Sequence, residues 1–317
     1  MNFQQLRIVR ETIRRQFNLT EVSSALFTSQ SGVSKHIKDL EDELGLTLFT
    51  RKGKRLLGLT EPGKEVARYA ERILQEAENL QAVALSFSKQ DEGRLVLATT
   101  HTQARYSLPE IVRRFREDFP KVHLVMHQAT PSEIATLMES DEADIGIATE
   151  SLRNNQNFLT FPFYRWYHGV IVPKGHPLTR VKQLTLQAIA KYPIVTYHEG
   201  FTGRSMIDET FAKAGLKPEI AMAALDADVI KAYVALGMGV GIVASVAYDE
   251  EADRELSLID GSEVFTENTT VLAVRRGRLL PGYATRFVQL CVRGLTEEAL
   301  QQAVQSRDVS PEGPRVA

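Results

Sequence analysis

The sequence predicts an α/β protein in two parts: a short helical head with a winged helix-turn-helix, and a larger part of alternating strands and helices. Apolar residues repeat at helical spacing over the first sixty residues, and a heptad repeat follows them. Strand-like and helix-like runs then alternate through most of the remaining chain, which indicates parallel sheets. They include expected strands at 194–197 and 240–244 and one long expected helix over 282–305. A length of 317 residues is that of two or three domains.

The composition is that of an ordinary globular protein, with 43% hydrophobic and 25% charged residues, which excludes disordered and fibrous chains. No run approaches the ~18 apolar residues of a membrane span, and the N-terminus lacks the apolar core of a secretory signal. We therefore expect a cytoplasmic protein without a membrane partner. The single cysteine, Cys291, lies in an apolar helical run, which favours a buried side chain over a redox sensor.

Charge is distributed unevenly along the chain. Residues 1–64 contain eleven Lys and Arg against seven Asp and Glu, a net charge of +4, whereas the rest of the chain carries −6. A basic head on an acidic body indicates an anionic partner for the head.

Three short helices are expected within the first 45 residues. The second covers 22–27, a polar turn follows at 28–32, and the third helix ends at Gly45. The apolar faces of the first and third helices are formed by Phe3, Leu6, Val9 and Ile13, and by Val33, Ile37, Leu40 and Leu44. This layout is a helix-turn-helix, which places its second helix in the major groove of DNA.

A basic run between expected strands at 48–50 and 56–59 predicts a wing that contacts phosphates. The alternative, a solvated charge run, is disfavoured by the adjacent helix-turn-helix. Gln can bond a base edge in two places, and Ser and Lys can reach bases or phosphates. The expected DNA-binding residues are Ser29, Gln30, Ser31, Ser34, Lys35, Lys38, Arg51, Lys52, Lys54 and Arg55.

The head carries a recognisable set of residues at fixed spacing. These are Ser29-Gln30, Val33-Ser34, Ile37, Leu40-Glu41, Gly45, Leu48-Phe49, Arg51, Leu59-Thr60 and Pro62-Gly63. Over about sixty residues the pattern resembles the winged helix-turn-helix of the LysR-type transcriptional regulators. The resemblance implies a regulator that binds double-stranded promoter DNA.

A heptad seam follows over residues 61–90, the expected linker helix. Its members are spaced alternately four and three residues apart: Val66, Ala70, Ile73, Ala77, Leu80, Ala84 and Phe87. The regular spacing and the absence of Gly or Pro inside the seam favour a dimer-forming coiled coil. The alternative is an amphipathic helix packed on its own domain. LysR-type regulators pair through such a helix, and the resemblance implies homotetramers built from these dimers.

The remaining chain is expected to form an effector domain of two α/β subdomains, one inserted in the other, as in periplasmic binding proteins. We place the DNA-binding domain at 1–60, the effector domain at 91–306 and a flexible tail at 307–317. Subdomain I covers about 91–163 and 267–306, and subdomain II about 164–266. Ligands of such folds bind at the carboxyl ends of strands.

Two loops of the larger part have the composition of an anion site. Residues 99–103 and 200–204 each follow a strand and precede a helix, and both offer hydroxyls and free backbone N–H groups. If they face each other, they form a small pocket for an oxyanion. The alternative for either loop is simple N-capping.

Five segments of this part, 98–106, 147–150, 196–197, 200–204 and 226–231, closely resemble the CysB branch of the LysR-type family, which includes Cbl. The resemblance covers about residues 1–300. It implies control of sulfate uptake and cysteine synthesis, with acetylated serine as inducer and sulfate or thiosulfate as related ligands. His198 and Glu199 depart from the pattern, and a carboxylate there would weaken anion binding or select a zwitterion. The implied effector-binding residues are Thr100, Thr102, Gln103, Thr149, Trp166 and Thr202.

Enzymatic and metal sites are not indicated. The seven histidines show no metal-ligand spacing, no nucleophile elbow or carboxylate pair stands out, and no cofactor is expected. The glycine-rich run 237–241 follows a helix and enters a strand, the reverse of a dinucleotide fingerprint. The alternatives are a solute-binding protein, an enzyme with a DNA-binding domain, and a sister regulator for sulfonates or another anionic metabolite.

Overall fold

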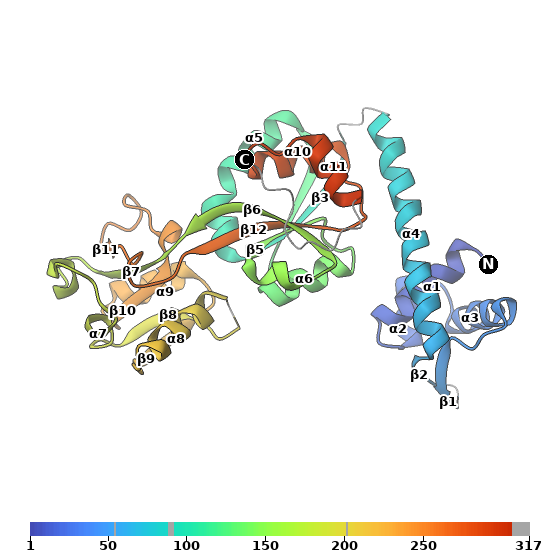
Figure 1. Cartoon of the computed structure of the whole chain (residues 1–317), viewed down its shortest axis with the longest axis horizontal. Coiled ribbons are helices and arrows are strands. Elements are labelled where there is room, and N and C mark those ends of the chain that lie inside the picture. The colour runs from blue at the N-terminus through green and yellow to red at the C-terminus, as the bar shows by residue number, and fades with distance from the viewer. Residues whose placement is uncertain (54, 88–91, 201, 306–317) are drawn as a thin grey trace. The chain divides into compact units, whose positions relative to one another are not determined.

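The structure, a computed structural model, describes residues 1–53, 55–87, 92–200 and 202–305 (Figure 1). Lys54 of the expected wing and the expected tail at 307–317 lie outside the described residues. The chain forms two compact units, one of residues 1–89 with 277–279 and one of the remaining residues. Within the described ranges, no helix is long and apolar enough to cross a membrane.

The first unit is a three-helix head with a two-stranded wing. Its elements are α1 (Phe3–Arg14), α2 (Leu19–Ala25), α3 (Gln30–Leu44), β1 (Phe49–Lys52), β2 (Arg55–Leu59) and α4 (Glu61–Phe87). Asn2, Asn18 and Ser29 cap the first three helices with their side chains, and Gly45 ends α3 in the left-handed conformation. One core joins these elements around Ile8, Val22, Ile37 and Leu48.

The second helix begins and ends earlier than the expected range 22–27. It ends at Ala25, and Phe27 lies beyond it with a φ of 50°. Positive φ is rare for a bulky residue and belongs to a tight turn. Phe27 is therefore part of the turn between α2 and α3, not of the apolar face of α2.

The heptad seam of α4 divides into two parts. Ala70 is buried with Leu6 and Leu74, and Val66 packs on the core of the head. This part takes the alternative role of an amphipathic helix packed on its own domain. Ile73 and Leu80 are 39% and 71% exposed. Exposed apolar surface of this kind is available to a partner helix. The side chain of Phe87 lies outside the described residues.

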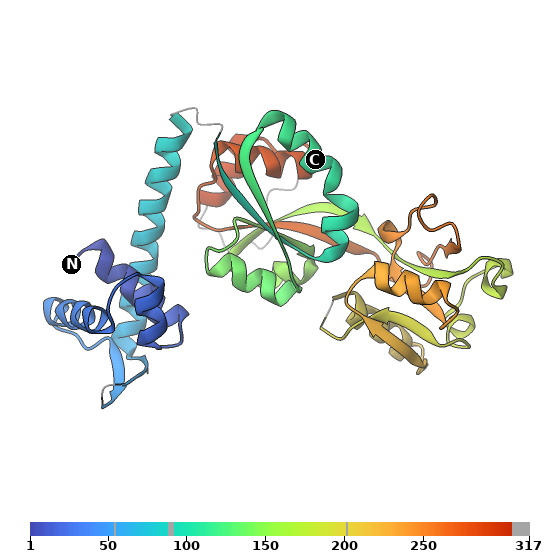
Figure 2. The ribbon, with the colours of Figure 1, turned by 180° about the vertical axis from the view of Figure 1, so that it is seen from behind.

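The second unit contains two five-stranded sheets. In the first sheet the strand order is β4-β3-β5-β12-β6, with β3 parallel to β4 and β5, and β12 antiparallel to β5 and β6. Its strands are β3 (Glu92–Thr99), β4 (Lys121–Gln128), β5 (Ile145–Thr149), β6 (Phe158–Trp166) and β12 (Asn268–Arg275). Figures 1 and 2 show α6 on one side of this sheet, and α5, α10 and α11 on the other. The helices are η1 (Gln103–Ser107), α5 (Pro109–Asp118), α6 (Pro131–Glu139), η2 (Glu150–Asn154), α10 (Gly282–Cys291) and α11 (Glu297–Gln305).

In the second sheet the strand order is β11-β7-β10-β8-β9, and α9 packs against it. Its strands are β7 (His168–Pro173), β8 (Ile194–Tyr197), β9 (Ile220–Ala224), β10 (Val240–Ala244) and β11 (Leu256–Ile259). The helices are η3 (Pro177–Arg180), α7 (Leu186–Ile189), α8 (Thr202–Lys213), α9 (Ala227–Ala235) and η4 (Ser245–Ala247). The chain crosses from the first sheet to the second between β6 and β7, and returns before β12.

Three features of this unit differ from the sequence-based expectation. Both sheets are mixed rather than parallel, because β12 and β7 run antiparallel to their neighbours. Strands β6 and β11 were not anticipated. The helix expected over 282–305 is two helices, since Gly294 adopts a φ of 78° between them.

Candidate DNA-binding surface and effector cavity

The outward face of α3 carries the residues expected to read DNA. Gln30, Ser31, Lys35 and Lys38 are exposed and Ser34 is half-buried. The opposite face, formed by Val33, Ile37 and Leu40, is at most 1% exposed and anchors the helix. The N-cap Ser29 uses its hydroxyl to accept from Gly32 N, at 3.0 Å. Ser29 therefore positions the helix start, and the Ser31 hydroxyl lies 3.0 Å from the Ser29 hydroxyl. The other four side chains, Gln30, Ser34, Lys35 and Lys38, are available to bases and phosphates.

In the wing, Arg51 is engaged by the protein itself. Its guanidinium donates to Glu41 Oε2 at 2.8 Å, while Glu41 Oε1 accepts from the backbone N–H of Leu48. This pairing ties β1 to α3. Lys52 and Arg55 are exposed on the two strands, and are therefore the described wing residues better placed for phosphates.

Phe27 was not among the expected DNA-binding residues. Its side chain is 98% exposed, and it lies in the turn that leads to Ser29 and Gln30. An exposed aromatic ring next to a recognition helix can contact a thymine methyl group. Sequence analysis missed this residue because a Phe at the end of an apolar helical pattern is normally predicted to be buried in the core.

Five of the six expected effector residues line one cavity of about 50 Å³ in the second unit: Thr100, Thr102, Gln103, Thr149 and Trp166. They lie at the carboxyl ends of β3, β5 and β6, and the ends of β8 and β10 complete the wall with Tyr197 and Ala244. This is the position at which ligands bind in open α/β sheets.

The cavity contains a buried hydroxyl without a partner. Thr149 is 8% exposed, and its Oγ1 makes no hydrogen bond within the described residues. Thr102 is instead hydrogen-bonded to Tyr197, whose hydroxyl also accepts from Ala244 N. Burial raises the pKa of Tyr197 to about 12, so the phenol stays neutral. Buried polar groups are normally paired, so the Thr149 hydroxyl is a candidate hydrogen-bond donor to a small molecule in this cavity.

Gln103 and Trp166 serve mainly as scaffold. Trp166 Nε1 and Gln103 Nε2 both donate to Thr270 Oγ1, at 3.1 and 3.3 Å, and Tyr164 donates to Gln103 Oε1. Ser107 in turn donates to Tyr164 at 2.7 Å. The indole N–H of Trp166 is thereby used, and Trp166 offers the cavity an apolar wall.

The second expected loop is less completely described. Thr202 begins α8, but its side chain and all of Phe201 lie outside the described residues. Gly203, in the first turn of α8, does line the cavity. His198 and Glu199 do not. Glu199 is exposed, 3.8 Å from Arg204, so its carboxylate does not face the candidate anion site.

Polar contacts join the two halves of the second unit beside the cavity. Tyr106 of η1 donates to Asp228 of α9, and Lys231 Nζ donates to the Tyr106 hydroxyl at 2.8 Å. Burial and the Asp228 hydrogen bond raise the pKa of Tyr106 to about 12. His101 also approaches Asp226 and Asp228, all ligand atoms lying within 4.8 Å. Spacing along the sequence could not reveal that these three side chains lie together, because His101 follows β3 whereas Asp226 and Asp228 lie at the start of α9.

His168 lies behind Trp166, with ring centroids 5.0 Å apart, and is 1% exposed. Burial lowers its pKa to about 4.

The buried His168 should make the stability of the protein depend on pH. As the pH falls through about 6.5, the imidazole becomes protonated in the unfolded chain but stays neutral in the folded chain. The free energy of unfolding therefore has its full value above pH 6.5 and decreases as the pH falls towards 4. At pH 5 the expected decrease is about 2 kcal/mol. Urea unfolding of wild type and His168→Phe at pH 7.5 and 5.0 measures it; equal losses in both proteins would contradict it.

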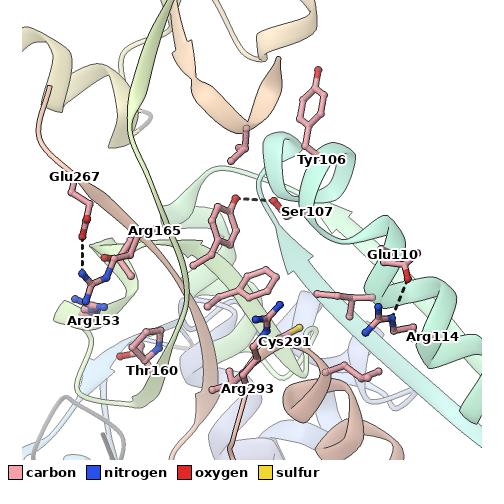
Figure 3. Close-up of a pocket in the computed structure, with 18 residues that line it drawn as sticks. Tyr106, Ser107, Glu110, Arg114, Arg153, Thr160, Arg165, Glu267, Cys291 and Arg293 are labelled. Atoms are coloured by element: carbon pink, nitrogen blue, oxygen red, sulfur yellow. Dashed lines mark hydrogen bonds and ion pairs between the residues drawn. The ribbon is translucent and has the colours of Figure 1, made fainter. Parts of the chain in front are cut away.

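A larger cavity of about 1160 Å³ is lined by Tyr106 and Ser107 of η1 and by residues of α5, β6 and α10 (Figure 3). Arg114 and Arg165 line it, but pair with Glu110 and Glu267. Cys291 also lines it, and burial raises the pKa of its thiol, which favours an unreactive side chain. The smaller cavity is the candidate effector site, because the unpaired Thr149 hydroxyl lines it and does not line the larger one.

Comparisons with known proteins agree with both halves of this description. Residues 3–64 match the family model of bacterial regulatory helix-turn-helix proteins of the lysR family, and residues 88–296 match the LysR substrate binding domain. The chain is 54% identical over 297 residues to the regulator SsuR of Burkholderia cenocepacia, covering 94% of this chain and 96% of SsuR. It is 53% identical over 304 residues to the regulator Cbl of Escherichia coli strain K12, covering 96% of each chain.

The regulator CysB of Burkholderia cenocepacia is 46% identical over 312 residues, covering 98% of this chain and all of CysB. Among solved structures, the cofactor-binding domain of the Cbl regulator superposes with a TM-score of 0.65 at 50% identity, covering 68% of this chain and 95% of that domain. These matches confirm the predicted family and its branch. The chain is a LysR-type transcriptional regulator, closely related to Cbl, CysB and SsuR.

Proposed function

We propose that the protein controls genes of sulfur acquisition in response to a small oxyanion bound in the Thr149 cavity. The carrying observation is the buried, unpaired Thr149 hydroxyl at the end of β5, facing a cavity that the first turn of α8 also lines. Hydroxyl and backbone N–H donors at a helix N-terminus bind anions without a lysine. The implied genes are those of sulfate assimilation and cysteine synthesis, and the protein acts in the cytoplasm on promoter DNA.

The size of the cavity favours a compact ligand. One water needs about 10–15 Å³ of such space, so about 50 Å³ accommodates an anion of the size of sulfate or thiosulfate. An acetylserine is larger, and would require the two sheets to move apart. Such an inducer would therefore act by stabilising a more open conformation, by no more than its difference in affinity for the two states.

A second candidate is a sister regulator of genes for sulfonates or another anionic metabolite. The chain is more similar to SsuR and Cbl, at 54% and 53% identity, than to CysB, at 46%. A sulfonate presents the same oxyanion face as sulfate, so the cavity accommodates both chemistries. In either case we propose dimers formed through the exposed residues of α4, assembled into tetramers on the promoter.

Replacing Thr149 with Val tests this site. We expect sulfate and thiosulfate affinity to fall about 10- to 100-fold, since a hydrogen bond to a charged group contributes about 1.5–3 kcal/mol. The unligated protein should keep its stability, because the lost hydroxyl has no partner. Calorimetric titration with sulfate, thiosulfate, an alkyl sulfonate and N-acetylserine provides the measurement and separates the two candidate functions.

The matched control is Thr136→Val on α6, where the hydroxyl is exposed and bonds its own helix. This variant should bind every probe as the wild type does. Unchanged affinity in Thr149→Val would show that the effector binds elsewhere.

A further inference from the structure

His168 holds a second buried donor that has no partner. Its Nδ1 lies 3.5 Å from Nδ2 of Asn268, and the same amide nitrogen donates to Thr266 O at 3.1 Å, which fixes the orientation of the amide. Because an amide nitrogen can only donate, Nδ1 is the acceptor and the ring proton is on Nε2. Nε2 makes no hydrogen bond within the described residues.

This donor lies against the wall of the candidate effector site, directly behind residues that line it, although His168 is not itself a lining residue. A Cβ placed on Gly203 would lie 3.1 Å from His168 Nε2, and Gly203 lines the cavity in the first turn of α8. Trp166, which forms the cavity wall, packs edge-on against the His168 ring. Ala244, another lining residue, is the register partner of His168 between β10 and β7. Three lining residues therefore surround His168 on the cavity side.

His168 also lies where the chain passes between the two sheets. It is the first residue of β7, two residues after the end of β6, and Asn268 is the first residue of β12 on the returning crossover. Asn268 is in turn the register partner of Trp166. A ligand that contacts His168 would therefore contact the first crossover directly, and Asn268 links His168 to the second.

We infer that His168 is a further effector-binding residue, whose Nε2–H donates to an oxygen of the bound oxyanion beside the Thr149 hydroxyl. This inference rests on the proposed function. An unpaired N–H buried to this extent costs free energy in the unligated protein, and the ligand removes that cost. The pair supplies a neutral donor and a hydroxyl, and no carboxylate lines the cavity within the described residues. The site is thus suited to an oxyanion that carries no proton, such as sulfate, thiosulfate or a sulfonate.

Calorimetric titration with sulfate and thiosulfate tests this in four variants of the full chain. His168→Phe keeps a ring but removes the donor, and should weaken binding about 10- to 100-fold. His168→Gln places an amide N–H near the same position and should restore most of the affinity. The matched control is His176→Phe, since His176 packs on Tyr192 outside the cavity. Thr149→Val reports on the cavity itself.

Thermal unfolding without ligand separates binding from structure. His168→Phe should unfold at the same or a higher temperature at pH 7.5, because it removes an unpaired buried group. Lower stability together with no recovery in His168→Gln would indicate a structural role and overturn the inference. Normal sulfate affinity in His168→Phe, with weak binding in Thr149→Val, would reject His168 and keep the cavity. If the wild type binds neither anion, or if neither Thr149→Val nor His168→Phe changes binding, both the inference and the effector site fail.

Discussion

Replacing Lys231 with Met should destabilise the second unit by about 3 kcal/mol, the cost of breaking a buried ion pair from one side. The Lys231 side chain is 8% exposed and donates to Asp253 Oδ2 at 3.0 Å and to Ala247 O at 2.9 Å. Asp253 is 10% exposed and would be left without this partner. The same change removes the ammonium from Tyr106, so the two halves of the unit should also separate more easily.

Urea unfolding at pH 7.5 measures the loss. The double variant Lys231→Met with Asp253→Leu should recover much of it, because no uncompensated buried charge remains. A matched control is Lys213→Met, whose pair with Glu209 is exposed on both sides and should contribute less than about 0.5 kcal/mol. Equal effects of the buried and exposed variants would show that the Lys231 network is not a stabilising element.

On DNA, replacing Gln30 or Ser34 with Ala should weaken promoter binding about 10- to 100-fold and reduce discrimination against unrelated sequence. These side chains lie on the outward face of α3, where base contacts contribute about 1–3 kcal/mol each. Lys38→Gln should instead weaken binding to all sequences and lower the salt dependence by about one counterion, as expected for a phosphate contact. Phe27→Ser should behave like the base-contact variants.

Fluorescence anisotropy with promoter and scrambled duplexes between 50 and 200 mM KCl distinguishes these behaviours. Arg68→Gln on α4 is the control of equal charge, since Arg68 pairs with Glu65 on an exposed surface of the linker helix. If Gln30→Ala and Ser34→Ala lose affinity equally for both duplexes, α3 contacts only the backbone, and sequence is read elsewhere.

Much of the fold could be predicted because burial imposes a period on the sequence. Strands β8 and β10 begin and end at the expected residues, since each is a short apolar run bounded by turn residues. Strand β6 was missed because Pro162 interrupts it and the strand tolerates the proline at an irregular register with β12. The helix break at Gly294 was missed because apolar spacing continues on both sides of it.

The sequence allowed us to predict that the candidate site lies at a set of strand ends. It did not reveal which of the residues there are held by other side chains and which are free to contact a ligand. Gln103 and Trp166 donate hydrogen bonds to Thr270. These contacts depend on the register between β6 and β12, which a single sequence does not reveal. Val66 and Ala70 have ideal heptad positions, yet a neighbouring helix in the same unit already covers them. His168 has no motif, and only its position beneath Gly203 makes it a candidate.

The two crossovers have an evolutionary consequence. Tyr167 and Glu267 mark the beginning and the end of the segment that forms the second sheet, and the Tyr167 hydroxyl donates to Glu267 at 3.0 Å. An inserted segment whose ends meet can be exchanged between homologous genes by two nearby recombination points, without disturbing the sheet that receives it. One half of the cavity could then acquire new specificity while the DNA-binding head and its promoters stay the same.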